Sequence, residues 1–238
     1  MAEISLYSHL IFLKNIGVSI FLNDNPNNHY NPVSNNKSLP IINEITNVKD
    51  LKELEKFVKN LKNIDLKNNA KSTVMGSGNE EANIMIIGEA PGAEEDNLSK
   101  PFVGAAGQLL NKMLIAIKLN RGDTYITNVV PWRPPNNRTP TNEEILECLP
   151  FVQKQIEIIK PKIIVLLGLT AAKAILNTNL GISQLRGQWH SYKSINYNKS
   201  INCIVTYHPS FLLRTPSFKK ESWEDLKNIQ KRIIDEKL

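Results

Sequence analysis

Several acidic residues lie beside a tight turn that follows a short apolar run, residues 84–87. The run stops at Gly88, which is typical of a buried strand that ends at the edge of a sheet. The Gly and Pro residues that follow bend the chain, so the backbone can approach a ligand closely. An aromatic residue, Phe102, stands in a second loop punctuated by Pro and Gly. The acidic residues beside the turn are Glu89, Glu94, Glu95 and Asp96.

This combination of a strand, a bent loop, carboxylates and an aromatic ring suits a pocket for a flat polar ring. The alternative is an ordinary strand-to-helix connection with solvated acids. The turn alone favours that alternative, because a single Gly/Pro turn is a weak signal. Polar residues at other strand ends must therefore decide between the two interpretations.

Two further polar side chains follow other predicted strands. Asn128 ends one of them, and its amide offers a donor and an acceptor that can match the carbonyl and ring N–H of a pyrimidine. His208 stands between another strand and Pro209, where an imidazole can hydrogen-bond a developing oxyanion or act in acid–base catalysis. The alternatives are an Asn in a turn and a structural His bonded to a carbonyl group. Convergence of several such groups on one sheet edge favours the functional interpretation.

A stiff cationic loop follows Asn128, since Arg133 and Arg138 lie among prolines and asparagines. It predicts contacts to phosphate groups, although a solvated loop would have the same composition. Past His208, residues 211–214 place large apolar side chains beside a cation. They predict either a helix start that buries its leucines or an apolar wedge that enters a base stack.

The elements that must position these residues alternate along the chain. Apolar runs predict four strands, and apolar residues at helical spacing predict a helix after each of them. This alternation indicates right-handed crossovers and an α/β fold whose parallel sheet is covered on both faces. In such sheets the ligand crevice lies outside the carboxyl ends of the strands. The predicted strands are residues 83–88, 124–130, 163–167 and 201–206, and the predicted helices are residues 105–119, 141–159, 170–176 and 217–235.

The first part of the chain differs in composition. Residues 1–22 carry apolar residues at helical spacing and are predicted to form an amphipathic helix. Residues 23–46 are crowded with Asn and contain prolines, so they cannot bury enough apolar area to order themselves and are predicted to form a flexible linker. The main domain is then predicted to span residues 47–238, and to begin with a helix over residues 47–61.

Charge and cysteine content limit the possible classes of protein. The 238-residue chain has a formal net charge of +6 and a pI of about 9.2, which fits a polyanionic partner without requiring one. Its two cysteines, Cys148 and Cys203, are too few for a disulfide framework and suit a reducing cytosol. No apolar run reaches the length of a membrane span. We expect neither membrane insertion nor a signal peptide.

Several separate motifs, agreeing in order and spacing, resemble those of the type-4 uracil-DNA glycosylases from about Leu51 to the end of the chain. The resemblance implies a three-layer α/β/α sandwich around a central four-stranded parallel sheet. It also implies cleavage of the N-glycosidic bond of uracil in DNA, which leaves an abasic site for base excision repair. The motifs are Gly88-Glu89-Ala90-Pro91-Gly92 with Glu95-Asp96, Pro101-Phe102-Val103-Gly104 with Gly107, Asn128 before Arg133-Pro134-Pro135, and Tyr207-His208-Pro209-Ser210 with Leu212-Leu213-Arg214.

The resemblance assigns roles to individual residues. Phe102 resembles the family's stacking aromatic, Asn128 the amide that reads uracil, and His208 the histidine that supports the uracil O2. Glu89 and Glu95 match acidic positions tied to water positioning and catalysis, and the sequence does not separate their roles. The remaining substrate-binding candidates are Gly88, Ala90 and Asn137, and the DNA-binding candidates are Arg133, Arg138, Ser210, Leu212, Leu213 and Arg214.

One departure from the family concerns cysteine. The family usually carries a 4Fe-4S cluster, which needs four thiolates. The upstream pair of ligand positions should fall near Leu61 and Ile64 and the third at Trp132, so only Cys148 remains. We therefore expect no cluster and no other metal, with Trp132 and the apolar residues of the upstream helix bracing the loop.

The expected partner is uracil-containing DNA, bound by a monomer in the cytoplasm that associates with the nucleoid when it acts. Three alternatives remain: a glycosylase accepting further deaminated bases, a catalytically idle nucleic-acid-binding module, and a scaffold or polymerase-associated protein recruited through the N-terminal helix. The intact Glu89, Asn128 and His208 speak against the idle module. A panel of modified bases and a pull-down with residues 1–45 test the other two.

Overall fold

The computed structural model describes residues 44–193 and 200–238. The predicted N-terminal helix, residues 1–22, and nearly all of the predicted linker, residues 23–46, lie outside the described residues. The compact unit that holds the site spans Ile45–Leu238. It begins two residues before the predicted start, because the side chain of Ile45 is buried.

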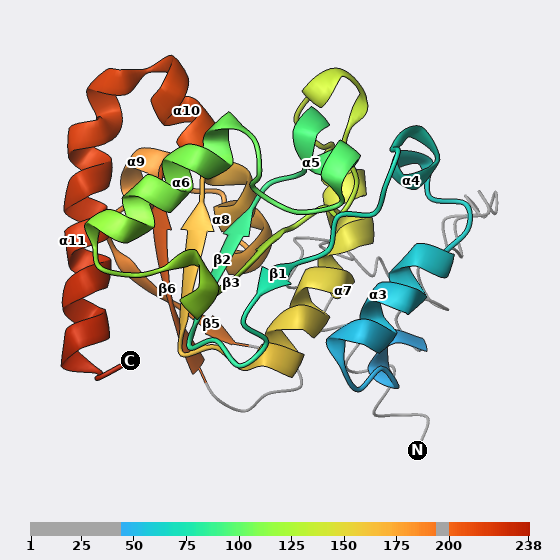
Figure 1. Cartoon of the computed structure of the whole chain (residues 1–238), viewed down its shortest axis with the longest axis horizontal. Helices are drawn as coiled ribbons and strands as arrows, with labels where there is room; N and C mark the ends of the chain where they lie inside the picture. The colour runs from blue at the N-terminus through green and yellow to red at the C-terminus, as the bar shows by residue number, and fades with distance from the viewer. Residues whose placement is uncertain (1–43, 194–199) are drawn as a thin grey trace, which may run out of the picture. The chain divides into compact units, whose positions relative to one another are not determined.

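In the described part of the chain, six strands form one sheet in the order β1-β3-β2-β4-β6-β5. The four central strands pair in parallel, which confirms the predicted parallel sheet (Figure 1). Two edge strands that the sequence did not predict, the two-residue β1 and the five-residue β5, pair antiparallel with β3 and β6. The strands are β1 (Ser77–Gly78), β2 (Ile84–Gly88), β3 (Thr124–Asn128), β4 (Ile163–Leu167), β5 (Trp189–Lys193) and β6 (Ser200–Thr206).

The central strands form because their sequences suit burial on both faces. All five residues of β4, Ile-Ile-Val-Leu-Leu, are buried, and so are all five of β2. Continuous runs of branched apolar residues are typical of parallel strands covered by helices on both sides. By contrast, only Tyr192 is buried in the edge strand β5. This exposure explains why β5 gave no apolar run in the sequence.

Within the described residues the predicted long helices are all present, with ends within a few residues of the expected ones. Three shorter helices, α4, α5 and α9, were not predicted, and α10 is the helix start that was one of two interpretations of residues 211–214. The helices are α3 (Leu51–Asn60), α4 (Asp65–Asn69), α5 (Ala93–Leu98), α6 (Ala105–Ala116), α7 (Asn142–Ile159), α8 (Leu169–Leu176), α9 (Ile182–Leu185), α10 (Pro209–Arg214) and α11 (Lys219–Asp235), with 3₁₀ turns η1 (Arg121–Asp123), η2 (Pro135–Asn137) and η3 (Pro216–Phe218).

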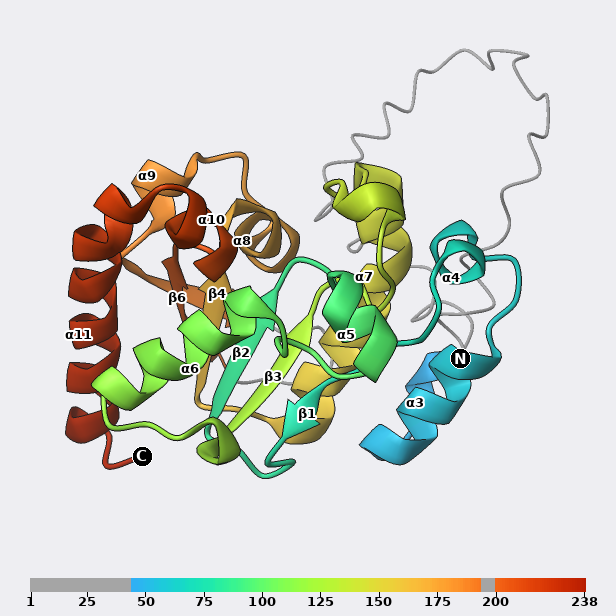
Figure 2. The same ribbon diagram turned by 45° about the horizontal axis from the view of Figure 1, so that its top comes forward.

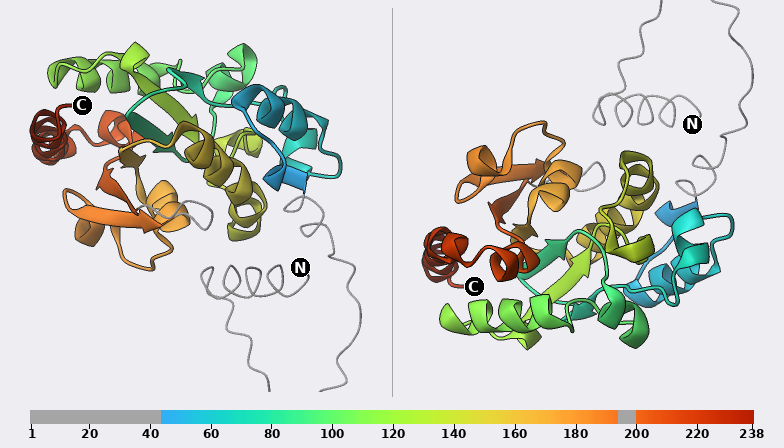
Figure 3. Two further views of the ribbon diagram at one scale, coloured as in Figure 1. Left: turned by 90° about the horizontal axis from the view of Figure 1, so that it is seen from below. Right: turned by 90° about the horizontal axis from the view of Figure 1, so that it is seen from above.

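Helices cover both faces of the sheet, which gives the expected three layers (Figures 2 and 3). On one face, Ile86 of β2 shares a core cluster with Leu110 of α6 and Leu226 of α11. On the other face, the buried Tyr125 hydroxyl of β3 donates to Gln155 Oε1 of α7 at 3.1 Å. No helix among the described residues is long and apolar enough to span a membrane.

The start of α7 is a capping box formed by Thr141 and Glu144. Thr141 Oγ1 accepts a hydrogen bond from the Glu144 backbone N–H at 3.3 Å, and Glu144 Oε2 accepts one from the Thr141 backbone N–H at 2.8 Å. These two bonds satisfy N–H groups that the first turn of a helix leaves without partners. The cap therefore fixes where the cationic loop ends and α7 begins.

Candidate active site

The ends of the central strands bring the candidate residues to one edge of the sheet. Gly88 at the end of β2 is paired in register with Asn128 at the end of β3. Leu167 at the end of β4 is likewise paired with Thr206, two residues before His208. The parallel sheet therefore confirms that these groups share its carboxyl edge, where ligands of such folds bind.

Phe102 packs directly on the end of β2. A Cβ atom at Gly88 would lie 2.4 Å from Phe102 Cζ and 2.5 Å from Asn128 Oδ1. Only glycine therefore allows the aromatic ring and the amide to meet at this point. The Phe102 backbone has a φ of +52°, a left-handed conformation that is uncommon for a bulky residue. Such strain persists only where the surrounding structure imposes it, and it clusters at functional sites.

The side-chain amide of Asn128 is buried without a partner. Asn128 is 3% exposed, and neither its Nδ2 nor its Oδ1 has a hydrogen-bond partner among the described residues. An unpaired buried amide costs about 1–3 kcal/mol, so native structures rarely keep one without a function. The amide lies against the Phe102 ring and is free to bind a ligand with a complementary donor and acceptor.

His208 is held as a neutral imidazole. Its Nδ1 accepts a hydrogen bond from the Ser210 backbone N–H at 3.2 Å, and the same atom lies 2.8 Å from Ser210 Oγ. An Nδ1 that accepts from the backbone places the ring proton on Nε2. Burial, together with the nearby Arg214 cation, lowers the pKa of His208 to about 4. The imidazole is therefore a neutral donor at physiological pH.

The His208 ring lies beside Phe102 and the end of β4. The two ring centroids are 5.6 Å apart with the planes tilted by 34°. Gly168 has a φ of +88°, and a Cβ there would lie 3.0 Å from His208 Cβ. The chain can thus turn closely around the imidazole after β4 only with glycine at this position.

The two predicted catalytic acids have different surroundings. Glu89 is half-buried just past β2, and its Oε2 accepts a hydrogen bond from Thr170 Oγ1 at 2.5 Å. Glu95 is buried, and its oxygens accept from the backbone N–H groups of Gly92, Val103 and Gly104 at 3.1, 3.0 and 2.9 Å. Glu95 lies in α5 with both carboxylate oxygens bound, so it is not one of the solvated acids of the alternative interpretation. Glu89 has the freer carboxylate, while Glu95 holds the turns that flank Phe102.

The remaining substrate-side candidates lie in exposed or half-buried turns. Ala90 is half-buried directly after Glu89. Asn137 is exposed, and its Oδ1 accepts a hydrogen bond from Arg133 Nε at 2.7 Å. Arg138 is exposed and donates to both carboxylate oxygens of Glu144, at 2.7 and 2.6 Å. The bond from Arg133 fixes the shape of the cationic loop, and Arg138 is bound to the helix cap behind it.

The segment after His208 forms a short helix, α10, which corrects one predicted DNA contact. Leu212 is 1% exposed and belongs to the core, because its position on the helix points it inward. Leu213 is 43% exposed, and Arg214 is exposed beside it. Ser210 is half-buried and caps His208. Leu212 therefore cannot enter a base stack, whereas Leu213 and Arg214 are available to DNA.

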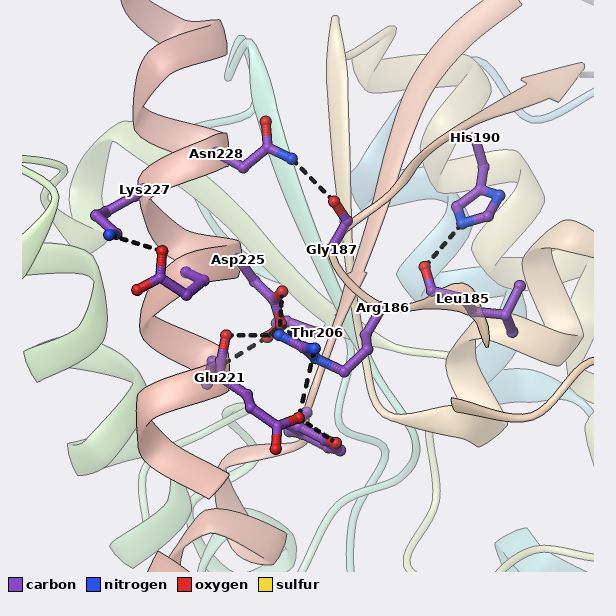
Figure 4. A network of polar contacts seen from close by, with 12 residues as sticks. Leu185, Arg186, Gly187, His190, Thr206, Glu221, Asp225, Lys227 and Asn228 are labelled. Atoms are coloured by element: carbon purple, nitrogen blue, oxygen red, sulfur yellow. Dashed lines mark hydrogen bonds and ion pairs between the residues drawn. The ribbon is translucent and has the colours of Figure 1, made fainter. Parts of the chain in front are cut away.

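A network of polar contacts lies behind the end of β6 (Figure 4). Arg186 donates to both carboxylate oxygens of the buried Asp225, at 3.2 and 2.6 Å, and to the Glu221 carbonyl at 2.6 Å. Thr206 Oγ1 donates to the same Asp225 carboxylate at 2.7 Å. The Arg186 guanidinium also lies 5.3 Å from the centroid of the Tyr207 ring. These contacts fix the strand end that leads into His208.

Three residues of the site and its supports were not singled out from the sequence. Thr170 begins a predicted helix and carried no predicted role, and its contact with Glu89 joins residues 81 positions apart. The Arg186–Asp225 pair joins residues 39 positions apart. No local sequence pattern indicates such contacts, because they arise only when the sheet is assembled.

The positions that the resemblance assigns to a 4Fe-4S cluster do not fit one. Ile64 and Trp132 are fully buried apolar side chains, and Trp132 packs edge-on against Phe151 with ring centroids 5.9 Å apart. Burial raises the pKa of the remaining thiol, Cys148, well above its ordinary value, which disfavours the thiolate that a metal needs. No group of three or more His, Cys, Asp or Glu residues in the described part of the chain is arranged to hold a metal ion.

Comparisons with known proteins agree with this site. Residues 75–227 match the model of the uracil DNA glycosylase superfamily. The chain is 42% identical over 182 residues to the type-4 uracil-DNA glycosylase of Pyrobaculum aerophilum, covering 74% of this chain and 91% of that protein. It is 40% identical over 186 residues to that of Archaeoglobus fulgidus, covering 76% and 92%. It is 45% identical over 150 residues to that of Thermotoga maritima, covering 63% and 76%.

Proposed function

The chain belongs to the uracil DNA glycosylase superfamily, and from this premise we propose how its residues act on DNA. It is a uracil-DNA glycosylase, a repair enzyme that hydrolyses the N-glycosidic bond of uracil in DNA. The observation that carries the assignment of individual roles is the buried, unpartnered amide of Asn128 beside the Phe102 ring. A base within a duplex is out of reach, so the uracil must be flipped into this pocket.

Asn128 reads the base while Phe102 stacks on it. Uracil carries a carbonyl oxygen at C4 next to a ring N–H at N3, and these match the amide donor and acceptor. Cytosine presents an amine and an unprotonated ring nitrogen at the same positions. The cytosine amine would face the Asn128 NH2 group, and the cytosine ring nitrogen would face the Asn128 carbonyl oxygen. Two unpaired polar groups in a buried site strongly disfavour binding of cytosine. Recognition of uracil thus depends on Asn128 Nδ2 and Oδ1, which have no hydrogen-bond partner among the described residues.

His208 stabilises the leaving group. As the bond between C1′ and N1 breaks, its electron pair moves into the uracil ring and negative charge develops on O2. A neutral imidazole with its proton on Nε2 can donate to that oxygen without bringing a charge into the pocket. One such donor contributes about 3–4 kcal/mol to transition-state stabilisation in a comparable oxyanion site.

Glu89 orients the water that captures the sugar cation. The Thr170 hydroxyl donates to one of its oxygens, which leaves the other available to accept a hydrogen bond from water. Glu95 is bound by three backbone N–H groups and acts as a positioning residue for the neighbouring turns. This division separates two acids that the sequence left equivalent.

DNA is bound by groups around the pocket. The half-buried Arg133 in the cationic loop and the exposed Arg214 in α10 contact phosphates, and the exposed Leu213 fills the space of the flipped base. Arg138 and Asn137 support the cationic loop through their contacts with Glu144 and Arg133. Ser210 acts through its cap on His208.

The test is incubation with an oligonucleotide that contains one uracil, followed by alkali to reveal abasic sites. Asn128→Asp should excise uracil about 10- to 100-fold more slowly, because a carboxylate repels O4 and lacks the donor. It should also gain some activity on cytosine. Unchanged uracil kinetics in Asn128→Asp and Asn128→Ala would remove Asn128 from the pocket. Comparable excision of hypoxanthine or xanthine by the wild type would replace a uracil-specific enzyme with a broader deaminated-base glycosylase.

The enzyme carries no iron–sulfur cluster in this proposal. Trp132 and Phe151 fill the position instead, and Trp132 Nε1 donates to Thr73 Oγ1 at 3.0 Å, which ties the cationic loop to the upstream segment. The purified protein should be colourless and active in the presence of chelators. Stoichiometric iron with charge-transfer absorbance would overturn this part of the proposal.

The enzyme also acts as a monomer in the cytoplasm, at the nucleoid. One compact unit carries every residue of the pocket, so no second copy is required. The free, buried thiols of Cys148 and Cys203 suit a reducing compartment. Light scattering on the purified protein and cell fractionation test these two statements.

A further inference from the structure

We propose that Arg121 is a positioning residue for base capture, because its guanidinium clamps the backbone of the loop that carries Phe102. The proposal rests on the function proposed above, in which Phe102 stacks on the flipped base. Arg121 begins η1, three residues before β3, and its side chain reaches the loop from there. None of the sequence motifs contains it.

The contacts of Arg121 are directed at main-chain carbonyl groups. Nη1 donates to the Phe102 carbonyl at 2.9 Å, and Nη2 donates to the Pro101 carbonyl at 2.6 Å. Nη1 also lies 3.3 Å from Asn111 Oδ1 of α6, which orients the guanidinium from the side. The planar fork of an arginine can bind two adjacent carbonyls at once, whereas the ammonium of a lysine acts as a point charge.

The clamp acts where the backbone is strained. Phe102 is left-handed at φ +52°, which costs on the order of 1–3 kcal/mol for a residue with a side chain. In this conformation its carbonyl lies close to α6, since a Cβ at Gly107 would be 1.9 Å from Phe102 O. Arg121 gives that carbonyl a partner and so favours the conformation that presents the ring to the pocket.

A second charged group holds the other side of the same loop. Glu95 accepts from the N–H groups of Val103 and Gly104, directly after Phe102. The loop is thus bound by a cation through the carbonyls before the turn and by an anion through the N–H groups after it. The Phe102 ring is buried, at 5% exposed, and the two fixed charges hold the backbone on either side of it, so together they define where the ring stands.

Loss of Arg121 should therefore reduce base capture through Phe102. Arg121→Gln should lower the single-turnover excision rate about 10- to 100-fold, the scale of a misplaced group. Arg121→Lys should lie between the wild type and Arg121→Gln. Lys118→Gln, which removes one positive charge from the connection between α6 and η1, is the matched control and should leave the rate unchanged.

The deciding experiment is a double-mutant cycle with Phe102→Ala. If Arg121 acts through the ring, Arg121→Gln should cost less than about threefold once the ring is gone. Equal losses in both backgrounds would show a general structural role and overturn the proposal. Melting temperatures of all four proteins separate misfolding from misplacement, and a folded Arg121→Gln variant with wild-type excision would also overturn it. If Phe102→Ala itself excises normally, the stacking role in the proposed function has failed instead.

Discussion

Phe102 and His208, the two proposed walls of the base pocket, are held in different ways. Phe102 stands in a loop between α5 and α6, where Arg121 donates to its carbonyl and Glu95 accepts from the next N–H, that of Val103. His208 stands at the end of a core strand, with a packed cluster of Tyr207, Phe211 and Phe218 beside it at centroid distances of 5.1–5.2 Å. Phe102 is itself buried, at 5% exposed, so the walls differ in what fixes the backbone: charged side chains on one side, and a core strand with aromatic packing on the other.

The difference matches the two tasks. In the proposed function the aromatic wall receives a base that arrives from outside, and polar contacts to the loop backbone set the position of its ring. The histidine wall must present one proton to one oxygen in the transition state, and preorganised groups stabilise charge best when they do not reorganise. We therefore expect substitutions at the loop wall to alter base capture, and those at the histidine wall to alter the chemical step or the stability of the fold.

The largest expected effect separates the walls directly. His208→Ala should lower single-turnover excision about 10²- to 10³-fold, the scale of one lost oxyanion donor. Affinity for uracil-DNA should change little, because the donor acts only as the bond breaks. Phe102→Ala should lose both rate and affinity. Rates and equilibrium binding on one oligonucleotide check this contrast. If His208→Ala loses affinity in proportion to rate, the imidazole is a binding group and the comparison is wrong.

The next effect concerns stability behind the histidine wall. Asp225→Ala leaves the half-buried Arg186 without its buried partner, and breaking a fully buried pair costs about 3–5 kcal/mol, which is the upper limit here. Excision per folded molecule should stay close to wild type. Glu224→Ala on the same helix, where the ion pair with Lys227 is exposed, is the control and should change stability by less than about 0.5 kcal/mol. Denaturant unfolding measures both, and equal losses would contradict the expected difference.

A smaller effect follows from the pKa of His208, which burial lowers to about 4. In the unfolded chain a histidine takes up a proton near pH 6.5. Between pH 6.5 and 4 the unfolded state therefore binds more protons, and the folded state loses about 1.4 kcal/mol for each pH unit of acidification. His208→Gln should remove this slope. Unfolding curves of the two proteins from pH 7 to pH 5 check it, and identical slopes would show that His208 is not held neutral.

The smallest effect concerns the DNA grip. Binding should weaken linearly when the logarithm of affinity is plotted against the logarithm of salt concentration, and Arg133→Gln should lower that slope by about one unit. Arg121→Gln should leave the slope unchanged, because its guanidinium is bound to carbonyls inside the fold. A reduced slope in Arg121→Gln would show that this arginine contacts a phosphate, and its role in positioning Phe102 could then not be separated from DNA binding.

The core of this fold was predictable because its signals are local. The buried runs of β2 and β4 and the capping box of α7 each lie within a few consecutive residues. The edge strands were missed because β1 has two residues and β5 is largely exposed, so neither buries an apolar run.

The site was predictable only in part, for related reasons. Strand ends indicated Asn128 and His208, but the inward position of Leu212 depends on the phase of α10, which adjacent leucines do not reveal. The division of labour between Glu89 and Glu95 depends on contacts to residues that only the folded chain brings near.

The unpartnered amide of Asn128 also bears on how such a chain evolves. An apolar side chain of similar size at this position would remove a buried polar group that costs about 1–3 kcal/mol, so it should stabilise the fold. Mutation supplies such replacements continually, and most proteins sit only just above the stability they need. In the proposed function, selection against mutagenic uracil is the force that retains the asparagine. In a duplicated gene copy that is no longer selected for uracil repair, residue 128 should soon be replaced by an apolar residue. An apolar residue at this position would therefore indicate from the sequence alone that uracil excision has been lost.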